Sequence, residues 1–354
     1  MSKIIVNLDG SPVAAKEGET ILEAATRAGV EIPTLCNDTR LDPAGACRTC
    51  LVEVEGQRRL VPSCATKVSP DMVVATQTER VKKHINVLLS LYAADHAQGE
   101  LGLASTNGNQ LAHMVREHAP LLPLEAVKSP REARQLETNP YLGFDPDLCI
   151  LCARCTRYCD EVEAVSAITL SERGSATTIA TAAQVSLMDS SCELCGGCVD
   201  TCPTGALFEI KAGRDHSKPI EKVRTTCNYC GVGCQMDLNV REGKVVKVTS
   251  PVTGTTLNDG NLCVKGRFAY DFIHHEERLQ TPLVRGTDGK LYPTSWEVAL
   301  ETASKGLLGV KERHGADALG FISSSRCTGE ENYLMQKLSR AAFGTNNIHQ
   351  CAAT

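Results

Sequence analysis

The chain has 354 residues, of which 42% are hydrophobic and 4% are aromatic, and its formal net charge is −5. This length fits about two to four domains, and the mild negative charge with scattered basic residues gives no basis for nucleic-acid binding. No secretory signal is visible at the start and apolar stretches such as Ile85–Ala94 are too short to span a bilayer, so we expect a soluble, cytoplasmic protein without membrane contact.

The eighteen cysteines are the main feature of the composition. Disulfide scaffolds are short and secreted, which does not fit this chain. Sixteen of the eighteen fall into four groups with the close spacing of iron–sulfur sites. Iron in such clusters takes soft thiolate ligands, normally four per cluster. The sequence therefore predicts single-electron transfer, in a chain whose folding is coupled to metal binding.

Residues 1–78 have the pattern of a β-grasp ferredoxin domain. Lys3–Leu8 alternates like a strand, and Asp9-Gly10 is a hairpin turn signal. Thr20 and Glu23 form a capping box for a helix that should end before Gly29. A second hairpin is predicted from two segments joined at Gly56, namely Leu51–Glu55 and Arg58–Val61.

The first cysteine group lies in the loop between this helix and the second hairpin and extends just past it, and it consists of Cys36, Cys47, Cys50 and Cys64. Its spacing of ten, two and thirteen intervening residues differs from the plant-type pattern C-x4-C-x2-C. We therefore assign it to another class of [2Fe–2S] site. Gly45 permits close approach of the backbone, so that amide N–H groups can point at sulfur.

Residues 79–138 are predicted to be a helical linker. Apolar residues recur there at helical spacing, at Val81, Ile85, Leu88, Leu89 and Tyr92. The proline-containing stretch Pro120–Pro130 is typical of a connection between domains.

Residues 139–215 contain two cysteine runs typical of a ferredoxin with two [4Fe–4S] clusters. In such modules the fourth cysteine of each run ligates the other cluster. One predicted site is therefore Cys149, Cys152, Cys155 and Cys202, and its neighbour is Cys192, Cys195, Cys198 and Cys159. Zinc is the alternative, because C-x2-C pairs also form zinc ribbons. Two runs of four cysteines with Cys202-Pro203 favour iron and sulfur.

Residues 220–276 are predicted to hold a third [4Fe–4S] cluster, bound by Cys227, Cys230, Cys234 and Cys263. A hairpin is expected between Cys234 and Cys263, with strands at Gln235–Val240 and Lys244–Val248 around Glu242-Gly243.

Residues 277–354 look like the start of an α/β domain. A strand is predicted at Leu319–Ser323 and a helix at Glu330–Phe343, with a polar loop between them. One clear strand does not make a complete α/β domain. Cys327 and Cys351 have no cluster partners, and we expect neither to be a ligand.

With these motifs, the chain resembles the N-terminal part of the catalytic (alpha) subunit of cytoplasmic formate dehydrogenases of the molybdenum/tungsten bis-pterin class. The fourth cysteine group with Val264–Arg267, and the segments Ser323–Tyr333 and Gly344–Ile348, carry this resemblance. It implies that Lys265 lies between the proximal cluster and a pterin, as a cofactor-binding residue and catalytic electron relay. The first 215 residues also resemble the large peripheral subunit of complex I and iron-only hydrogenases, but no H-cluster motif follows.

The chain departs from this family between the first two cluster domains. The family has a His-x3-Cys-x2-Cys-x5-Cys site there, whereas this chain keeps His96 and has Glu100, Leu103 and Asn109 at the cysteine positions. These side chains cannot replace thiolates on a [4Fe–4S] cluster. We therefore expect a degenerate site without a cluster, in which His96 is a solvated remnant.

The second departure is at the last residues, Cys351-Ala-Ala-Thr354. The family continues with a cysteine or selenocysteine metal ligand at the next position. A reading frame that ends at a selenocysteine codon is the interpretation we favour. A fragment, or a naturally short electron-transfer subunit, is the alternative. On the favoured interpretation the chain alone should be inactive with formate.

The expected fold class is multidomain α+β: a β-grasp [2Fe–2S] domain, a helical linker, a two-cluster ferredoxin-like domain, a [4Fe–4S] domain of bis-pterin oxidoreductases and an incomplete α/β pterin-binding domain. One [2Fe–2S] and three [4Fe–4S] clusters would carry electrons. In the complete enzyme, bis-molybdopterin guanine dinucleotide with molybdenum or tungsten would oxidise formate or reduce CO2.

The resemblance implies a hetero-oligomeric complex with an electron-transfer partner. That partner would be a flavin- or NAD(P)-linked subunit, a ferredoxin or a hydrogenase component. The alternative function is a stand-alone electron-carrier subunit of a hydrogenase or complex I-like oxidoreductase, with no catalytic site of its own.

Overall fold

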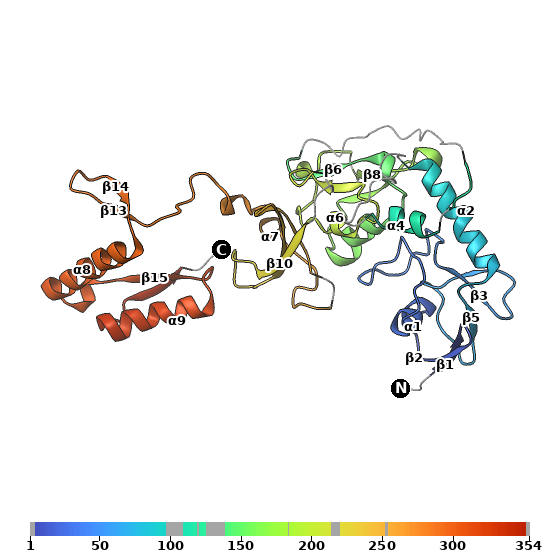
Figure 1. Ribbon diagram of the computed structural model, residues 1–354, viewed down its shortest axis with the longest axis horizontal. Coiled ribbons are helices and arrows are strands. Elements are labelled where there is room, and N and C mark those ends of the chain that lie inside the picture. The colour runs from blue at the N-terminus through green and yellow to red at the C-terminus, as the bar shows by residue number, and fades with distance from the viewer. Residues whose placement is uncertain are drawn as a thin grey trace.

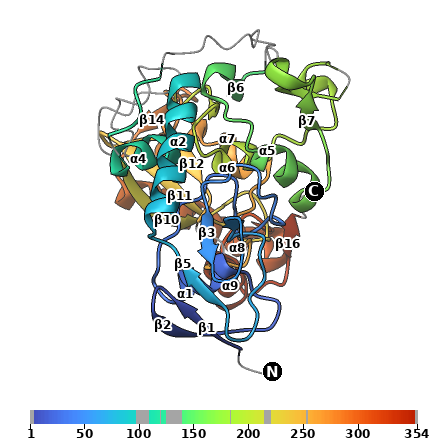
Figure 2. The same ribbon diagram turned by 90° about the vertical axis from the view of Figure 1, so that its right-hand side faces the viewer.

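The computed structural model describes residues 4–96, 109–118, 120–124, 139–182, 184–213, 220–251 and 254–351. The molecule is elongated, with the N-terminal domain at one end and the C-terminal domain at the other (Figure 1). The cysteine-rich domains lie between these ends. Viewed from the end that carries the N-terminal domain, the domains overlap (Figure 2), so they follow one another along the long axis.

The N-terminal domain contains a five-stranded sheet with strand order β2-β1-β5-β3-β4. Its strands are β1 (Ile4–Leu8), β2 (Ser11–Ala15), β3 (Leu51–Val54), β4 (Val61–Pro62) and β5 (Val73–Ala75). The predicted turn between β1 and β2 is present, with Asp9 and Gly10 at positive φ (49° and 84°). The second hairpin is shorter than predicted, and β5, which was not predicted, pairs parallel with β1 and antiparallel with β3.

Helix α1 (Ile21–Arg27) packs on this sheet and has the predicted capping box. Thr20 Oγ1 accepts from the backbone N–H of Glu23 (3.2 Å), and the Glu23 carboxylate accepts from the backbone N–H of Thr20 (2.7 Å). The helix ends at Arg27, and Gly29 follows at φ 78°. This short helix leads directly into the first cysteine loop.

Helices α2 (Glu79–Asp95) and α4 (Gln110–Glu117) cover that loop. Val81, Ile85 and Leu89 of α2 are buried, as their spacing predicted. They share a core with residues of α4, of the first cysteine loop and of the next cysteine run, namely Leu111, Met114, Leu35, Cys36, Cys47 and Cys152. The predicted linker is therefore partly a packing layer between two cluster domains. The predicted Pro120–Pro130 connection lies mostly outside the described residues.

The two-cluster domain consists of short elements around its cysteines. Two antiparallel pairs form, β6 (Leu142–Phe144) with β9 (Leu207–Glu209) and β7 (Ile168–Ser171) with β8 (Thr178–Thr181). The helices are α5 (Arg154–Arg157), the π-helical turn Tyr158–Val162 and α6 (Gly197–Thr201), with 3-10 turns at Pro146–Leu148, Gly174–Ala176 and Leu187–Asp189.

The next domain has a three-stranded antiparallel sheet of β10 (Glu221–Thr226), β11 (Gln235–Arg241) and β12 (Lys244–Thr249). The predicted hairpin is β11–β12, with Glu242 and Gly243 at positive φ (51° and 75°). Strand β10 was not predicted. Helix α7 (Val264–Phe268) and a 3-10 turn (Asp271–Ile273) follow the last cysteine.

The C-terminal domain contains a β–α–β unit. Strands β15 (Phe321–Ser324) and β16 (Ile348–Cys351) are parallel, and α9 (Gly329–Lys337) with the π-helical turn Leu338–Phe343 connects them. Strand β15 starts two residues later than predicted. The other elements, which were not predicted, are the hairpin β13 (Leu283–Arg285) and β14 (Leu291–Pro293), helix α8 (Trp296–His314) and the 3-10 turn Ala316–Ala318. Among the described helices none could cross a bilayer.

Candidate metal centres

The first cysteine group forms a closed site in the N-terminal domain. Its four members have exposed fractions of 0–2%: Cys36, Cys47, Cys50 and Cys64. The backbone N–H groups of Cys36 and Cys47 donate to each other's Sγ atoms at 3.4 Å. Hydrogen bonds from Cys47 and Cys64 lower the pKa of the Cys36 thiol, against the effect of burial. Four buried sulfurs with N–H donors are a donor set that fits a cluster of iron.

Helix α2 supports this loop from outside. The Tyr92 hydroxyl donates to the carbonyl of Cys47 (3.2 Å). Between the two central cysteines, Arg48 adopts a left-handed conformation (φ 60°), and Gly45 before them does so too. The turn that brings these sulfurs together is therefore strained at one non-glycine residue.

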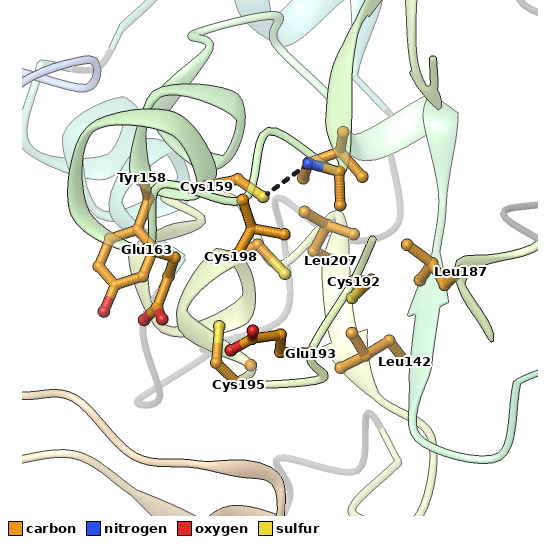
Figure 3. A pocket seen from close by; sticks show the side chains of 14 residues that line it. Leu142, Tyr158, Cys159, Glu163, Leu187, Cys192, Glu193, Cys195, Cys198 and Leu207 are labelled. Atoms are coloured by element: carbon orange, nitrogen blue, oxygen red, sulfur yellow. Dashed lines mark hydrogen bonds between the residues drawn. The ribbon is translucent and has the colours of Figure 1, made fainter. Parts of the chain in front are cut away.

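The two middle cysteine groups line two separate cavities. One cavity contains Cys149, Cys152, Cys155 and Cys202 among its lining residues. The other contains Cys159, Cys192, Cys195 and Cys198 (Figure 3). The fourth cysteine of each run thus lies with the three cysteines of the other run. The predicted ligand sets combine the two runs in the same way, and that these cysteines are ligands stays a prediction.

Both cavities are built by the same local geometry. Residues between the cysteines adopt left-handed conformations at equivalent places, Leu151 and Ala153 in one run (φ 54° and 58°) and Leu194 and Gly196 in the other (φ 55° and 72°). Backbone N–H groups point at sulfur in the cavity of Cys195, from Ala167 to Cys159, Leu194 to Cys192 and Gly197 to Cys195, at 3.2–3.5 Å. Figure 3 shows the first of these contacts as a dashed line.

Burial makes free thiolates unfavourable in both cavities. It raises the pKa of Cys152 and of Cys195 to about 12, and the pKa of Cys155 and Cys198 well above the usual range. A thiolate needs a compensating positive charge in such a place. Iron would supply it, so these residues fit the cofactor that their spacing predicts. Bound clusters supply sites that accept and release single electrons.

The fourth cysteine group is more open than the other three. Cys227 is buried, whereas Cys230 and Cys263 are exposed. The N–H of Cys227 donates to the carbonyl of Cys234 (2.8 Å), which closes the loop. A Cβ on Gly266 would lie 3.6 Å from Cys227 Sγ, so helix α7 passes directly over this sulfur. Lys265, the expected relay, lies on α7 and is exposed.

Arg267, two residues after Lys265, connects this domain to the cavity of Cys195. Its guanidinium is buried and forms an ion pair with Asp200 (2.8 Å). It also donates to the Cys195 carbonyl (2.6 Å) and to Ser250 Oγ (2.9 Å). The sequence did not reveal this role, because no local pattern pairs Arg267 with residues 67 or more positions earlier.

The degenerate site of the linker differs from expectation. His96 was predicted to be solvated, but its exposed fraction is only 4%, and both ring nitrogens lack hydrogen-bond partners among the described residues. Desolvation lowers its pKa. Asn109 caps helix α4 by accepting from the N–H of Ala112 (3.0 Å). Glu100 and Leu103 lie outside the described residues.

Cys327 is exposed in the loop before α9, and Cys351 is the last residue of β16. That neither is a ligand stays a prediction. Within the described ranges, no three His, Cys, Asp or Glu side chains converge as they would around a single ion. An iron–sulfur cluster does not require such convergence on one point, because its four thiolates are divided among two or four irons.

Four domain families match successive parts of the chain. They are the 2Fe-2S iron-sulfur cluster binding domain (residues 2–79), the ferredoxin-like domain of NADH-quinone oxidoreductase subunit 3 (140–208), the molybdopterin oxidoreductase Fe4S4 domain (220–275) and the molybdopterin oxidoreductase domain (278–354). The chain therefore combines iron–sulfur domains with domains of molybdopterin oxidoreductases.

Among curated proteins, the chain is 36% identical over 356 residues to the alpha subunit of an NADPH-Fe(3+) oxidoreductase of Geobacter sulfurreducens, covering 98% of this chain and 40% of that protein. It is 36% identical over 351 residues to one subunit of an NADH-quinone oxidoreductase of Rhizobium meliloti, with coverage of 98% and 40%. A protein of Staphylococcus haemolyticus with a provisional formate dehydrogenase name is 30% identical over 388 residues, with coverage of 99% and 39%.

The chain thus spans about 40% of the length of the curated relatives it matches. Among solved structures, it resembles a chain of an NAD+-reducing [NiFe]-hydrogenase in the H2-reduced state. The TM-score is 0.54 at 28% identity, covering 60% of this chain and 89% of that chain.

Proposed function

We propose that this chain is the iron–sulfur electron-transfer part of a molybdopterin-type oxidoreductase, with one [2Fe–2S] and three [4Fe–4S] clusters. The observation that carries this proposal is the pair of adjacent cavities, each with four cysteines drawn from both runs of the two-cluster domain. The ligands would be the four cysteine sets that the spacing predicts. Each set would hold its cluster through thiolates that a reducing compartment keeps free.

The contacts between domains support one order of electron transfer. Arg157 donates to the carbonyl of Cys36 (2.5 Å), so the cavity of Cys155 lies towards the first site. Arg267 donates to the carbonyl of Cys195, so the second cavity lies towards the fourth site. The proposed sequence runs from the pterin side through Cys227, Cys195 and Cys155 to the [2Fe–2S] site of Cys36, or in reverse.

Lys265 would act at the pterin end of this sequence. It is exposed on the helix that passes over Cys227 Sγ, beside two exposed cysteines of the same group. This position supports a role for its ammonium between the cluster and the pterin that the matched domain families would bind. Its positive charge would hold an anionic group of the pterin and stabilise added electrons.

Two overall functions are candidates for the protein, formate oxidation and electron transfer without a catalytic site. Formate, with its oxidation to CO2, is favoured by the segments Ser323–Tyr333 and Gly344–Ile348 and by the Staphylococcus relative. An electron-carrier subunit without its own catalytic site is favoured by the Geobacter and Rhizobium relatives and by the hydrogenase structure. In both cases a flavin- or NAD(P)-linked, ferredoxin or hydrogenase partner would exchange electrons with the N-terminal domain.

The cluster content is directly measurable. Protein reconstituted with iron and sulfide under argon should hold about fourteen irons, from one two-iron and three four-iron clusters. A Cys195→Ser variant should lose about four of them. An iron content near eighteen would show a fifth cluster at the degenerate linker site, and zinc in place of iron would overturn the proposal.

The choice between the two candidates needs the protein in its native complex. Formate-dependent reduction of a viologen dye, abolished by removal of the molybdenum or tungsten cofactor, is the result expected of a formate dehydrogenase. Reduction of the clusters by NADH or NADPH through a partner, with no response to formate, would instead identify an electron carrier.

A further inference from the structure

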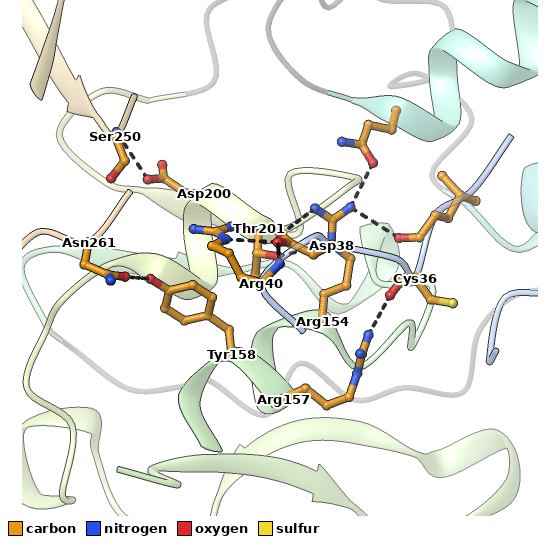
Figure 4. A network of polar contacts seen from close by, with 12 residues as sticks. Cys36, Asp38, Arg40, Arg154, Arg157, Tyr158, Asp200, Thr201, Ser250 and Asn261 are labelled. Carbon is orange, nitrogen blue, oxygen red and sulfur yellow. Dashed lines mark hydrogen bonds and ion pairs between the residues drawn. The ribbon is translucent and has the colours of Figure 1, made fainter. Parts of the chain in front are cut away.

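A buried charged cluster joins the N-terminal domain to the two-cluster domain (Figure 4). Asp38, two residues after Cys36, forms an ion pair with Arg154, the residue before Cys155, at 3.1 Å. Each side chain is only 7% exposed. A buried ion pair of this kind is costly to desolvate, so its presence beside two ligand loops calls for an explanation beyond stability.

Asp38 is surrounded by donors from both domains. Arg40 binds both of its carboxylate oxygens, at 2.9 and 2.8 Å. The Thr201 hydroxyl, next to Cys202, donates to it at 2.7 Å. The carboxylate thus contacts the sequence neighbours of Cys155 and Cys202, which are two predicted ligands of the same [4Fe–4S] site. Asp38 itself lies two residues after Cys36 of the first site, so it connects the two sites.

Arg154 has an equally complete set of acceptors. Besides Asp38, its guanidinium donates to Thr201 Oγ1 (3.1 Å) and to Gln110 Oε1 of helix α4 (2.9 Å). It also approaches the carbonyl of Leu35, the residue before Cys36, at 3.4 Å. Arg154 therefore holds the first cysteine loop, the linker helix and the second cluster site in one arrangement.

Positive charge predominates in this cluster. Arg40, Arg154 and Arg157 place three guanidinium groups here, against the single buried carboxylate of Asp38. Two other acidic groups lie near these arginines. Asp200 acts on Arg40 but is itself paired with the buried Arg267 (2.8 Å), and Glu161, which accepts from the backbone N–H of Asp42, is exposed at the rim. Water screens charges at the rim far more than buried charges.

We propose that Asp38 and Arg154 are positioning residues that fix the first cysteine loop against the Cys149–Cys155 cavity and set the reduction potentials of the two clusters there. This inference rests on the proposed function. A cluster gains negative charge when it is reduced, so a buried guanidinium nearby stabilises the reduced state and a buried carboxylate destabilises it.

The test is a comparison of two charge-removing variants in reconstituted protein. Arg154→Gln should lower the reduction potential of the [2Fe–2S] centre, and Asp38→Asn should raise it. The shift should be on the order of tenfold in the ratio of oxidised to reduced centre, or about 59 mV for a one-electron couple. Redox titration monitored by electron paramagnetic resonance measures it. If the ion pair only held the two domains together, the potential of the [2Fe–2S] centre would shift in the same direction in the two variants or stay unchanged in both.

Matched controls come from an ion pair within the N-terminal domain, Arg27 with Glu19 at 2.7 Å, where the arginine is 42% exposed. Arg27→Gln and Glu19→Gln should leave the potentials unchanged. Arg154→Lys retains the charge and should restore the potential towards the wild-type value, which separates the charge effect from misfolding. Iron analysis of the wild type tests the proposed function independently. Intact clusters with unshifted potentials in both charge-removing variants would overturn this inference alone.

Discussion

At the scale of single residues, the ligand loops concentrate backbone conformations that side chains rarely adopt. Leu151, Ala153 and Leu194 all have φ between 54° and 58°. Each such residue costs about 1–3 kcal/mol, and the surrounding structure must compensate for it. The gain is that consecutive cysteines turn towards one point, which a regular helix or strand would not allow. The strain is thus a consequence of presenting several sulfurs to one cluster.

Gly196 is the position where this geometry is most sensitive. It has φ 72°, and a Cβ there would lie 2.1 Å from Cδ of Arg267. We expect Gly196→Ala to displace Arg267, to destabilise the protein by about 3 kcal/mol or more, and to weaken iron retention at Cys195. Chemical denaturation and iron analysis of the same samples measure both effects.

Gly205 provides the control for this prediction. It has a similar φ (71°), but a Cβ there would meet nothing within 4 Å. Gly205→Ala should therefore cost only about 1–2 kcal/mol from the left-handed backbone and retain the full iron content. If Gly196→Ala and Gly205→Ala lost equal stability and equal iron, the contact with Arg267 would be unimportant.

At the scale of elements, the cores of the N-terminal and two-cluster domains differ in composition. The N-terminal core is mainly aliphatic, with Val6, Leu8, Ile21, Val52 and Val74 all at most 3% exposed, and only two of its buried residues are cysteines, Cys50 and Cys64. The core of the two-cluster domain includes six cysteines among its packing residues, namely Cys149, Cys155, Cys159, Cys192, Cys198 and Cys202. The first domain has an apolar core of its own, whereas the second has short strands and helices around its sulfurs.

Removal of iron should therefore affect these domains unequally. After chelation, we expect β1, β2 and α1 to retain slow amide hydrogen exchange, because burial of their apolar side chains does not depend on metal. Residues 139–213 should lose protection, because metal binding and folding are coupled there. Mass spectrometry of deuterium uptake before and after chelation resolves the two regions. Equal loss of protection in both would contradict this account.

At the scale of the whole molecule, the C-terminal domain is separated from the rest by an extended connection (Figure 1). Residues 274–281 are all exposed. The helices beyond it also present large apolar side chains to solvent, including Trp296 (69%), Leu300 (60%) and Tyr333 (64%). Exposed apolar surface of this extent is typical of a face that contacts further protein.

This connection should be an early site of proteolysis. Brief trypsin treatment should cleave after Arg278, which precedes the exposed Leu279 (71%), and separate residues 279–354 from the cluster domains. The clusters should remain bound to the larger fragment, because all four cysteine sets precede the cut. Arg278→Gln should slow this cleavage, as intact mass analysis of the fragments would show. Early cleavage within residues 139–213 would contradict the expected order.

The sequence by itself predicted several local elements and the grouping of the middle cysteines. The Asp9-Gly10 turn, the Thr20–Glu23 capping box and the β11–β12 hairpin depend on neighbouring residues, and the structure contains all three. The cysteine spacing likewise placed the cysteines of the two middle runs in two mixed sets, and both cavities contain those sets. Short-range geometry is encoded within a few residues, so patterns in the sequence reveal it.

Only the tertiary structure decided how these sites lie relative to one another. Arg154 meets Asp38 across 116 residues, and Arg267 meets Cys195 across 72. Strand β5 joins the sheet because β1 and β3 offer it free edges, although its three residues carry little signal of their own. His96 is buried although its sequence context predicted solvation. Such contacts depend on how separate domains pack, and a single sequence does not specify which distant side chains that packing brings together.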